Sequence, residues 1–242
     1  MKSLSLSALS ALATTLALGS AQAEVITQWH FNSITPDGAS GTGSALPSVG
    51  AGTLALIGGV TTPSFNSGVG SSDPAASDNS GLQTTTYGAQ GSGNRTRGLE
   101  VKVDATGFED IVFSYDLRHS NTSSRYELAQ YSLDGVNFVD YAVFDSGLGD
   151  TWFNARTIDL SSVAGADHNA KLAFRVVATF APGTSGYLAS DASKTFSGSG
   201  TWRFDMVTVS GTATAVPEPS STAAGLAGLA AIGFLARRRR PA

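Results

Sequence analysis

Carboxylates are the side chains of this 242-residue sequence that could do hydrolytic chemistry. Cleavage of a glycosidic bond needs two of them, one to donate a proton and one to act as a base or nucleophile. Carboxylates on strands ordinarily lie on solvated faces, so the sequence indicates no catalytic pair and leaves a secreted glycoside hydrolase as the least favoured function. The candidates, which all fall on predicted strands or at strand ends, are Glu100, Glu109, Asp110, Asp116 and Glu127.

The three histidines belong to no recognisable catalytic or zinc-binding motif. His30, His119 and His168 stand far apart, and none lies in an HxH or HExxH pattern. The sequence contains no GxSxG elbow and no Walker loop, and the segment GTGSAL at 41–46 has only two glycines. The absence of cysteine excludes disulfides and thiolate zinc sites. We therefore expect no catalytic residue and predict that the protein is not an enzyme.

A structural calcium ion is a better use of the carboxylates. Ca²⁺ takes six to eight oxygen ligands from Asp, Glu and loop carbonyls. The candidates are Asp37, Asp73, Asp78 and Asp205, although the spacing of an EF-hand is absent and solvated surface charge is the alternative at each. Of these, Asp205 is the predicted ligand of a structural calcium, and no other cofactor is expected.

Aromatic side chains in loops could stack on sugar rings. Trp152, Tyr187 and Tyr141 lie in or next to predicted loops, and Trp152 and Tyr187 are the candidate glycan-binding residues. Packing in the core is the alternative for each, and it is the expectation for Trp29 and Trp202, which fall within predicted strands.

Strands with hydrophobic alternation would position these side chains. In the segment 109–119, Ile111, Phe113, Tyr115 and Leu117 face one way, and period two over eight residues is typical of a half-buried strand. Only 160–170 could form a single helical turn. The pattern predicts an all-β fold, an antiparallel β-sandwich or jelly roll. The predicted strands are 25–31, 53–57, 99–104, 109–119, 124–132, 136–144, 155–160, 170–180 and 201–211.

The segment 32–97 is rich in Gly, Ser, Thr, Pro, Asp and Asn and is predicted to be rich in loops. A disordered linker over 62–97 is the competing interpretation. Loops on a rigid scaffold often carry a binding surface, so this segment could also contribute to function.

The N-terminus has the three parts of a secretory signal. Lys2 precedes an apolar run, and Ala21-Gln22-Ala23 supplies the small residues of a cleavage site. We predict a signal peptide over 1–23 and an exported domain over 24–214. Residues 24–218 hold ten basic and nineteen acidic residues, a formal net charge of -9 against -4 for the whole chain. Such a surface repels phosphate backbones, so no nucleic-acid partner is expected.

The C-terminal segment 215–242 has three parts in a fixed order. A turn, Val216-Pro217-Glu218-Pro219, precedes sixteen uncharged residues at 221–236 and then Arg237, Arg238, Arg239 and Arg240. As a helix, 221–236 would be about 24 Å long, short for a hydrocarbon core of roughly 30 Å. Four arginines would hold its end on the cytoplasmic side. We predict a short transmembrane helix that anchors the precursor transiently.

These three parts closely resemble the bacterial PEP-CTERM sorting signal. The resemblance implies recognition by an exosortase, a membrane-embedded enzyme of Gram-negative bacteria that make exopolysaccharide, with cleavage near Pro217-Glu218-Pro219. Signal peptidase, the Sec translocon and the inner membrane are the other implied partners. The body resembles the β-sandwich domains that often precede this signal. More distantly it resembles jelly-roll carbohydrate-binding modules, in some of which an Asp placed like Asp205 helps to bind calcium.

The sequence thus predicts an exported, non-enzymatic protein of the cell surface or extracellular matrix, associated with exopolysaccharide. Its precursor would be anchored in the inner membrane, and its mature form would lie at the surface. The alternative is a carbohydrate-binding module of jelly-roll type.

Overall fold

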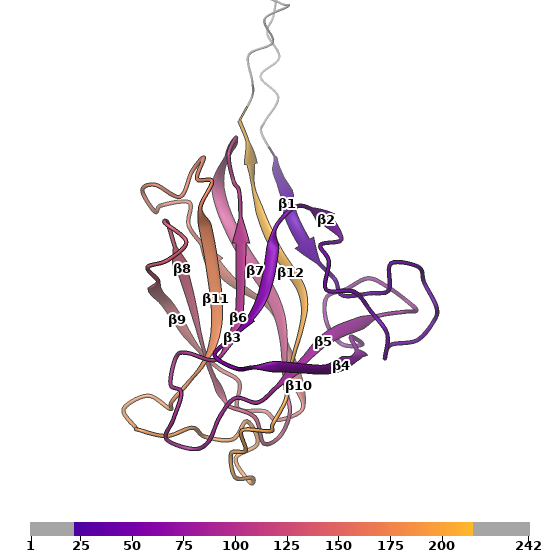
Figure 1. Ribbon diagram of the computed structural model, residues 1–242, viewed down its shortest axis with the longest axis vertical. Coiled ribbons are helices and arrows are strands. Elements are labelled where there is room, and N and C mark those ends of the chain that lie inside the picture. Colours follow the sequence, from indigo (N-terminus) through magenta and orange to yellow (C-terminus); the bar gives the residue numbers. More distant parts are fainter. Residues whose placement is uncertain (1–21, 215–242) are drawn as a thin grey trace, which may run out of the picture.

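The computed structural model describes residues 22–214, in which all regular structure is β-strand. The strands form two antiparallel sheets that pack face to face (Figure 1). The predicted fold class, an antiparallel β-sandwich, is confirmed. Residues 1–21 of the predicted signal peptide and the predicted helix at 221–236 lie outside the described residues. Within 22–214, no helix is long and apolar enough to cross a membrane.

The first sheet has seven strands and the second has five. In the first sheet the order is β10 (Thr151–Asp159), β7 (Phe108–His119), β12 (Trp202–Ala213), β1 (Ala23–Trp29) and β2 (Val49–Gly50), with β5 (Ser80–Thr85) also paired to β12 and β4 (Thr61–Ser67) paired to β5. In the second sheet the order is β3 (Thr53–Ile57), β6 (Gly98–Val103), β11 (Leu172–Thr179), β8 (Tyr126–Ser132) and β9 (Val139–Asp145).

The core lies between the sheets and follows the predicted alternation. The inward residues of β7, from Ile111 to Leu117, are at most 1% exposed. Phe113 of β7 stacks on Phe174 of β11 with ring centroids 4.6 Å apart, which joins the two sheets. Trp29 and Trp202 are fully buried, as expected. Full burial of one such side chain contributes about 1.5–3 kcal/mol, and this core therefore holds the fold without disulfides.

Strand β12 has two different partners along one edge. Residues 202–204 pair with β5, whereas 207–212 pair with β1. Between the two stretches the register of β12 against β7 shifts, and Met206 has a positive φ of 45°. This β-bulge places Asp205 at the point where one neighbouring strand ends and the next begins.

Three segments differ from the sequence prediction. The stretch 62–97 forms β5 and most of β4, where a disordered linker was the competing interpretation. The segment 160–170 forms turns and no helix. Strand β10 begins at Thr151, four residues before its predicted start, and this places Trp152 in a strand.

Both ends of the described chain emerge at the same end of the sandwich (Figure 1). Ala23 of β1 pairs with Thr212 of β12, and the Thr214 amide N–H donates to the Gly107 carbonyl oxygen at 2.9 Å. Backbone hydrogen bonds therefore hold the chain in the folded body as far as Thr214.

Candidate functional site

The bulge in β12 buries a carboxylate. Asp205 is 0% exposed. Its Oδ2 accepts a hydrogen bond from Ser71 Oγ at 2.7 Å, and its Oδ1 accepts one from the Met206 amide at 2.8 Å. Burial, together with smaller effects of the charges of Asp73 and Asp116, raises the pKa of Asp205 to about 8, although its two hydrogen bonds act in the opposite direction. The carboxylate is costly to ionise in this environment unless a cation balances its charge.

A side-chain amide oxygen faces the same small space. Asn79 is 6% exposed, and its Oδ1 has no hydrogen-bond partner among the described residues. A Cβ atom on Gly68 would collide with both Asn79 Oδ1 and Asp205 Oδ2, so the two oxygens converge on the point where Gly68 has no side chain. A buried acceptor with no donor costs about 1–3 kcal/mol. An unpaired oxygen beside a buried carboxylate is the donor set that suits a hard cation.

Asp73 joins this site to the loop after β1. Asn32 Nδ2 donates to Asp73 Oδ2 at 2.7 Å, and Asn32 Oδ1 accepts from the Ser80 amide at 2.7 Å. Asp73 Oδ1 accepts from the Ala75 amide at 2.8 Å. Loops that are far apart in the sequence, near 32 and near 75, are therefore held together next to Asp205.

Asp116 fixes the same loop from β7. It pairs across the strands with Asp205 and is 1% exposed. Its two carboxylate oxygens accept hydrogen bonds from the Ser72 amide and, at 2.8 Å, from the Ala155 amide. Asp116, one of the candidate carboxylates for a glycosidase pair, thus holds the backbone at Ser72 and Ala155 in place. We call Asp73, Asn79, Asp116, Asp205 and the segment 68–75 the loop site.

Trp152 lies against the loop site rather than in a free loop. Its Nε1 donates to the Val69 carbonyl oxygen at 3.0 Å, and a Cβ on Gly70 would lie 2.7 Å from its ring. Asn154 Nδ2 adds a hydrogen bond to the Gly70 carbonyl oxygen at 3.0 Å. The indole is half-buried, so one part of it holds the loop and another part faces solvent.

No cationic side chain neutralises the loop site within residues 22–214. None of its three carboxylates forms an ion pair there, as the ion pairs of this segment all involve other acids. The same segment has no group of three or more His, Cys, Asp or Glu side chains arranged to ligate a metal. A calcium ion at the loop site would therefore need amide, hydroxyl and carbonyl oxygens as well, which Ca²⁺ accepts.

Tyr187, the other predicted glycan-binding residue, is in the interior. It is 1% exposed, and its ring stacks on Phe196 at 4.5 Å and meets the edge of Phe180 at 4.7 Å. Its hydroxyl donates to the Ser92 carbonyl oxygen at 3.0 Å. Because its ring is covered by protein, Tyr187 presents no surface on which a sugar could stack, and the expectation of an accessible ring is corrected. Burial also raises the pKa of this hydroxyl.

A second buried polar group joins the two sheets and includes Glu127, one of the candidate carboxylates of the sequence, with partners that the sequence did not indicate. Glu127 of β8 is 0% exposed and lies 3.1 Å from His119 Nε2 and 3.2 Å from Arg156 Nε. Ser146 Oγ donates to Glu127 Oε2 at 2.9 Å. The Arg156 guanidinium lies over the rings of Phe144 and Phe153. We call Glu127, His119 and Arg156 the cross-sheet cluster, and its enclosure leaves no access for a substrate.

The remaining glycosidase candidates are on the surface or in ion pairs. Glu100 Oε2 pairs with Arg175 at 2.6 Å, and Glu109 lies 3.2 Å from His168. Asp110 is exposed. The structure therefore does not bring these carboxylates into one open cleft.

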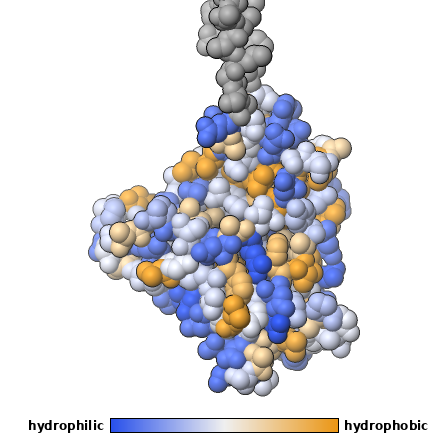
Figure 2. Space-filling model, turned by 180° about the vertical axis from the view of Figure 1, so that it is seen from behind, coloured by the Kyte–Doolittle hydropathy of each residue, from blue (hydrophilic) through white to orange (hydrophobic). Residues whose placement is uncertain are grey.

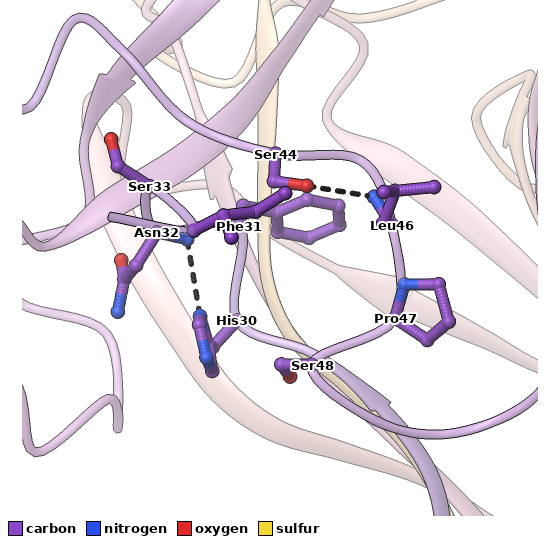
Figure 3. Close-up of a pocket in the computed structure, with 9 residues that line it drawn as sticks. His30, Phe31, Asn32, Ser33, Ser44, Leu46, Pro47 and Ser48 are labelled. Atoms are coloured by element: carbon purple, nitrogen blue, oxygen red, sulfur yellow. Dashed lines mark hydrogen bonds between the residues drawn. The ribbon is translucent and has the colours of Figure 1, made fainter. Parts of the chain in front are cut away.

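A cavity of about 340 Å³ lies beside the loop that follows β1 (Figure 3). His30, Phe31, Leu46 and Pro47 line it together with serine hydroxyls and Asn32. The Asn32 amide donates to His30 Nδ1 at 3.1 Å, so this ring nitrogen is an acceptor. No carboxylate lines the cavity, and its lining combines apolar side chains with neutral polar ones. Over the face of the molecule in Figure 2, hydrophobic and hydrophilic residues are likewise interspersed.

Three solved structures show a distant similarity to this chain. The CBM22-1–GH10 modules of Clostridium thermocellum endo-1,4-β-D-xylanase 10B, complexed with xylohexaose, match at 14% identity and a TM-score of 0.43, over 80% of this chain and 29% of that one. The CBM22-1 xylan-binding domain of Paenibacillus barcinonensis Xyn10C matches at 13% identity and a TM-score of 0.39, over 67% of this chain and 87% of that one. The cleaved K1 adhesin domain of Lys-gingipain from Porphyromonas gingivalis W83 matches at 14% identity and a TM-score of 0.31, over 69% of this chain and 100% of that one.

These similarities carry no information on ligands, because each TM-score is below 0.5. This chain spans 29% of the length of the xylanase chain that it matches. No curated protein matches the sequence. The C-terminal segment gives the informative match: residues 215–240, which lie outside the described residues, match the model of the PEP-CTERM protein-sorting motif. The chain is therefore a β-sandwich protein that carries a PEP-CTERM sorting motif directly after its last strand.

Proposed function

We propose that this chain is an exported, non-enzymatic protein of the bacterial cell surface or extracellular matrix, processed by an exosortase and associated with exopolysaccharide. The observation that carries the proposal is the PEP-CTERM match over 215–240. Its geometry fits such processing. The last ladder residue of β12 is Ala213, so a cut near Pro217 leaves the sheet intact. A cut after Ala23 likewise removes only the first residue of β1.

The non-enzymatic part of the proposal is supported by how the acidic side chains are used. Asp116 holds backbone, Glu127 is enclosed in the cross-sheet cluster, and Glu100 is paired with Arg175. A glycosidase needs two carboxyl groups roughly 5–9.5 Å apart across an open substrate site.

Processing is tested in a host strain with its exosortase and in the same strain lacking it. In the parent strain, the mature protein should lose its C-terminal arginines, whereas replacement of Pro217, Glu218 and Pro219 by alanine should leave a larger, membrane-bound precursor. Replacement of Ser210 and Thr212 by alanine, which changes only the folded body, is the control and should be processed normally. Equal processing in the two strains would contradict the proposal.

We also propose that the loop site binds one structural Ca²⁺, with Asp205 and Asn79 among its ligands. This proposal is supported by the unpaired Asn79 Oδ1, by the buried Asp205 carboxyl group and by the lack of any ion pair to Asp205 among residues 22–214. The ion would stabilise the fold by binding the native state, by about 2.7 kcal/mol at a calcium concentration one hundred times the Kd.

Gly68→Ala tests the calcium proposal without changing a charge. A methyl group at this position would fill the space between Asn79 Oδ1 and Asp205 Oδ2, so calorimetry should show calcium affinity weakened by tenfold or more. Gly41→Ala is the matched control, since a Cβ there meets nothing within 4 Å. If both variants bind calcium like the parent protein, the loop site is not the calcium site.

Carbohydrate binding is the second candidate function, favoured by the half-buried Trp152 on the edge strand β10. Pull-down on exopolysaccharide of the producing strain should lose binding with Trp152→Ala and keep most of it with Trp152→Phe, which retains an aromatic ring. Tyr141→Ala removes an exposed aromatic ring elsewhere and is the control. Absence of binding to any polysaccharide would eliminate this candidate.

A further inference from the structure

Two arginines lie directly opposite each other on the outer face of the first sheet. Arg118 of β7 pairs in register with Arg203 of β12. Their strand neighbours Leu117 and Phe204 are fully buried in the core, so by alternation both arginines point to the face away from it. Opposed positions bring Cβ atoms to about 4.5–5.5 Å, and like charges placed there repel. The sheet therefore concentrates positive charge at one place on a body whose net charge is negative.

The same register places an aromatic ring and an amide at the two ends of this pair. Trp152 of β10 pairs with Arg118, and Gln83 of β5 pairs with Arg203. We call Trp152, Arg118, Arg203 and Gln83 the arginine row. The row crosses four neighbouring strands and is therefore about 14 Å long. A polymer laid along it would meet a ring, two cations and an amide in that order.

Arg203 is the buried cation of the row. It is 9% exposed, and it forms no ion pair with an acid among residues 22–214. Its Nη1 donates to the Ser67 carbonyl oxygen at 2.7 Å and its Nη2 to Gln83 Oε1 at 2.8 Å, whereas its Nε has no hydrogen-bond partner in the described chain. Burial and the charge of Arg118 lower the pKa of Arg203 to about 10, so it stays cationic at neutral pH. A buried cation held only by neutral acceptors favours an anion nearby.

Arg118 is the accessible cation of the row. Its side chain is 23% exposed, and its Nη2 lies 2.7 Å from Oδ1 of Asp150, whose side chain is 55% exposed. A carboxylate therefore already reaches this guanidinium from the solvent side. The two arginines and this single aspartate leave one positive charge over. The planar fork of an arginine suits a carboxylate, whose two oxygens it can bind side by side.

We propose that the arginine row binds an acidic polysaccharide, with a uronic acid carboxylate at Arg118 and a neighbouring sugar ring against Trp152. Arg203 would add charge from below, and the Gln83 amide can donate to a sugar hydroxyl. The inference rests on the carbohydrate-binding candidate and names its ligand class: an aromatic ring alone suits neutral glycans, whereas the arginine pair selects for carboxylates. The negative charge of the rest of the body disfavours a polyanion elsewhere and would confine binding to the row.

Surface plasmon resonance of the processed protein tests this inference. The probes are polygalacturonate and the exopolysaccharide of the producing strain, each in native form and after reduction of its carboxyl groups to alcohols. The parent protein should bind a native polymer about tenfold or more tightly than its reduced form. Arg118→Gln should remove that preference. Asp150→Asn should strengthen binding about two- to fivefold, because it frees Arg118 from a competing carboxylate, and a damaged fold would not produce such a gain.

The matched controls are Arg95→Gln and Asp140→Asn, which break another partly exposed Arg–Asp pair at 2.6 Å and should leave binding unchanged. If Arg95→Gln weakens binding as much as Arg118→Gln, the effect is one of overall charge and the inference is wrong. Equal binding of native and reduced polymers, lost with Trp152→Ala, would overturn the acidic ligand and keep the carbohydrate-binding candidate. Absence of binding to both forms of both polymers would overturn the two together.

Discussion

At the scale of single residues, Asp205 is the group whose environment differs most from that of an ordinary carboxylate. It is buried at a bulge, near two other acids, and its pKa is raised to about 8. The folded protein therefore holds a proton on Asp205 more tightly than the unfolded chain does. Calcium at the loop site would replace that proton, because metal ligands must be deprotonated.

The pH dependence of stability follows from the sign of this shift. The contribution of Asp205 to stability is fully present below its unfolded pKa, near 4, and is lost as the pH rises through about 8. In chelator, the free energy of unfolding should therefore be about 3–4 kcal/mol lower at pH 8 than at pH 5, which corresponds to a fall in Tm of roughly 6–16 °C. Calcium should reverse this fall at pH 8.

Asp205→Asn should abolish both the pH dependence and its reversal by calcium, as thermal melts followed by circular dichroism would show. Carboxylates whose pKa is lowered, such as Asp145 beside Arg125, change stability only below about pH 4 and do not interfere. An equal fall in Tm in Asp205→Asn would show that another group is responsible.

At the scale of strands, the cross-sheet cluster connects β8 of one sheet to β7 and β10 of the other. Removing one partner of a buried ion pair leaves the other charge uncompensated. Arg156→Met should therefore destabilise the protein by about 3–5 kcal/mol in urea unfolding. The double variant Arg156→Met/Glu127→Gln should recover part of that loss, because no buried anion remains.

The control for this prediction is Arg125→Met, which breaks the partly exposed Arg125–Asp145 pair at 2.6 Å. That variant should lose about 1 kcal/mol or less. If the two single variants are equally destabilised, or if the double variant recovers nothing, charge compensation is not what the cross-sheet cluster supplies.

The strands also show what sequence could predict. Alternation identified β7 and the C-terminal part of β12, because burial of one face imposes period two. It also identified β11, although residues on both faces of that strand are buried. It missed β4 and β5, whose Ser, Thr and Gly residues resemble loop composition. The residues that contact Asp205 could not be predicted from the sequence either. Asn79 and Gly68 are ordinary loop residues in the sequence, and only the fold brings Asn79 Oδ1 to the carboxylate.

The two aromatic candidates illustrate the same limit. Sequence placed Trp152 and Tyr187 in or near loops, but loops can fold back onto the core. Tyr187 is covered by Phe180 and Phe196, which arrive from either side of it in the sequence. The indole N–H of Trp152 donates to the carbonyl oxygen of Val69, which is more than 80 residues away in the sequence. Exposure of an aromatic ring depends on such distant partners, which local composition does not specify.

At the scale of the whole molecule, the two ends of the body lie together and the loop site lies away from them. Seven residues of β12 separate Thr212 from Asp205, a rise of about 23 Å along a strand. A protein held at its C-terminal end would thus present the loop site and Trp152 outward.

The body is also predicted to fold without the C-terminal segment. The fragment 24–214 should melt within about 2 °C of a chain that ends at 217, since the described core lies wholly within 24–214.

The fate of the C-terminal segment decides whether this chain is an exosortase substrate, and mass spectrometry of the intact protein extracted from the cell surface tests it directly. We expect a mature chain that begins at Glu24 and ends near Pro217, with calcium-dependent stability of the remaining sandwich. Surface protein that still carries Arg237 to Arg240 would contradict it.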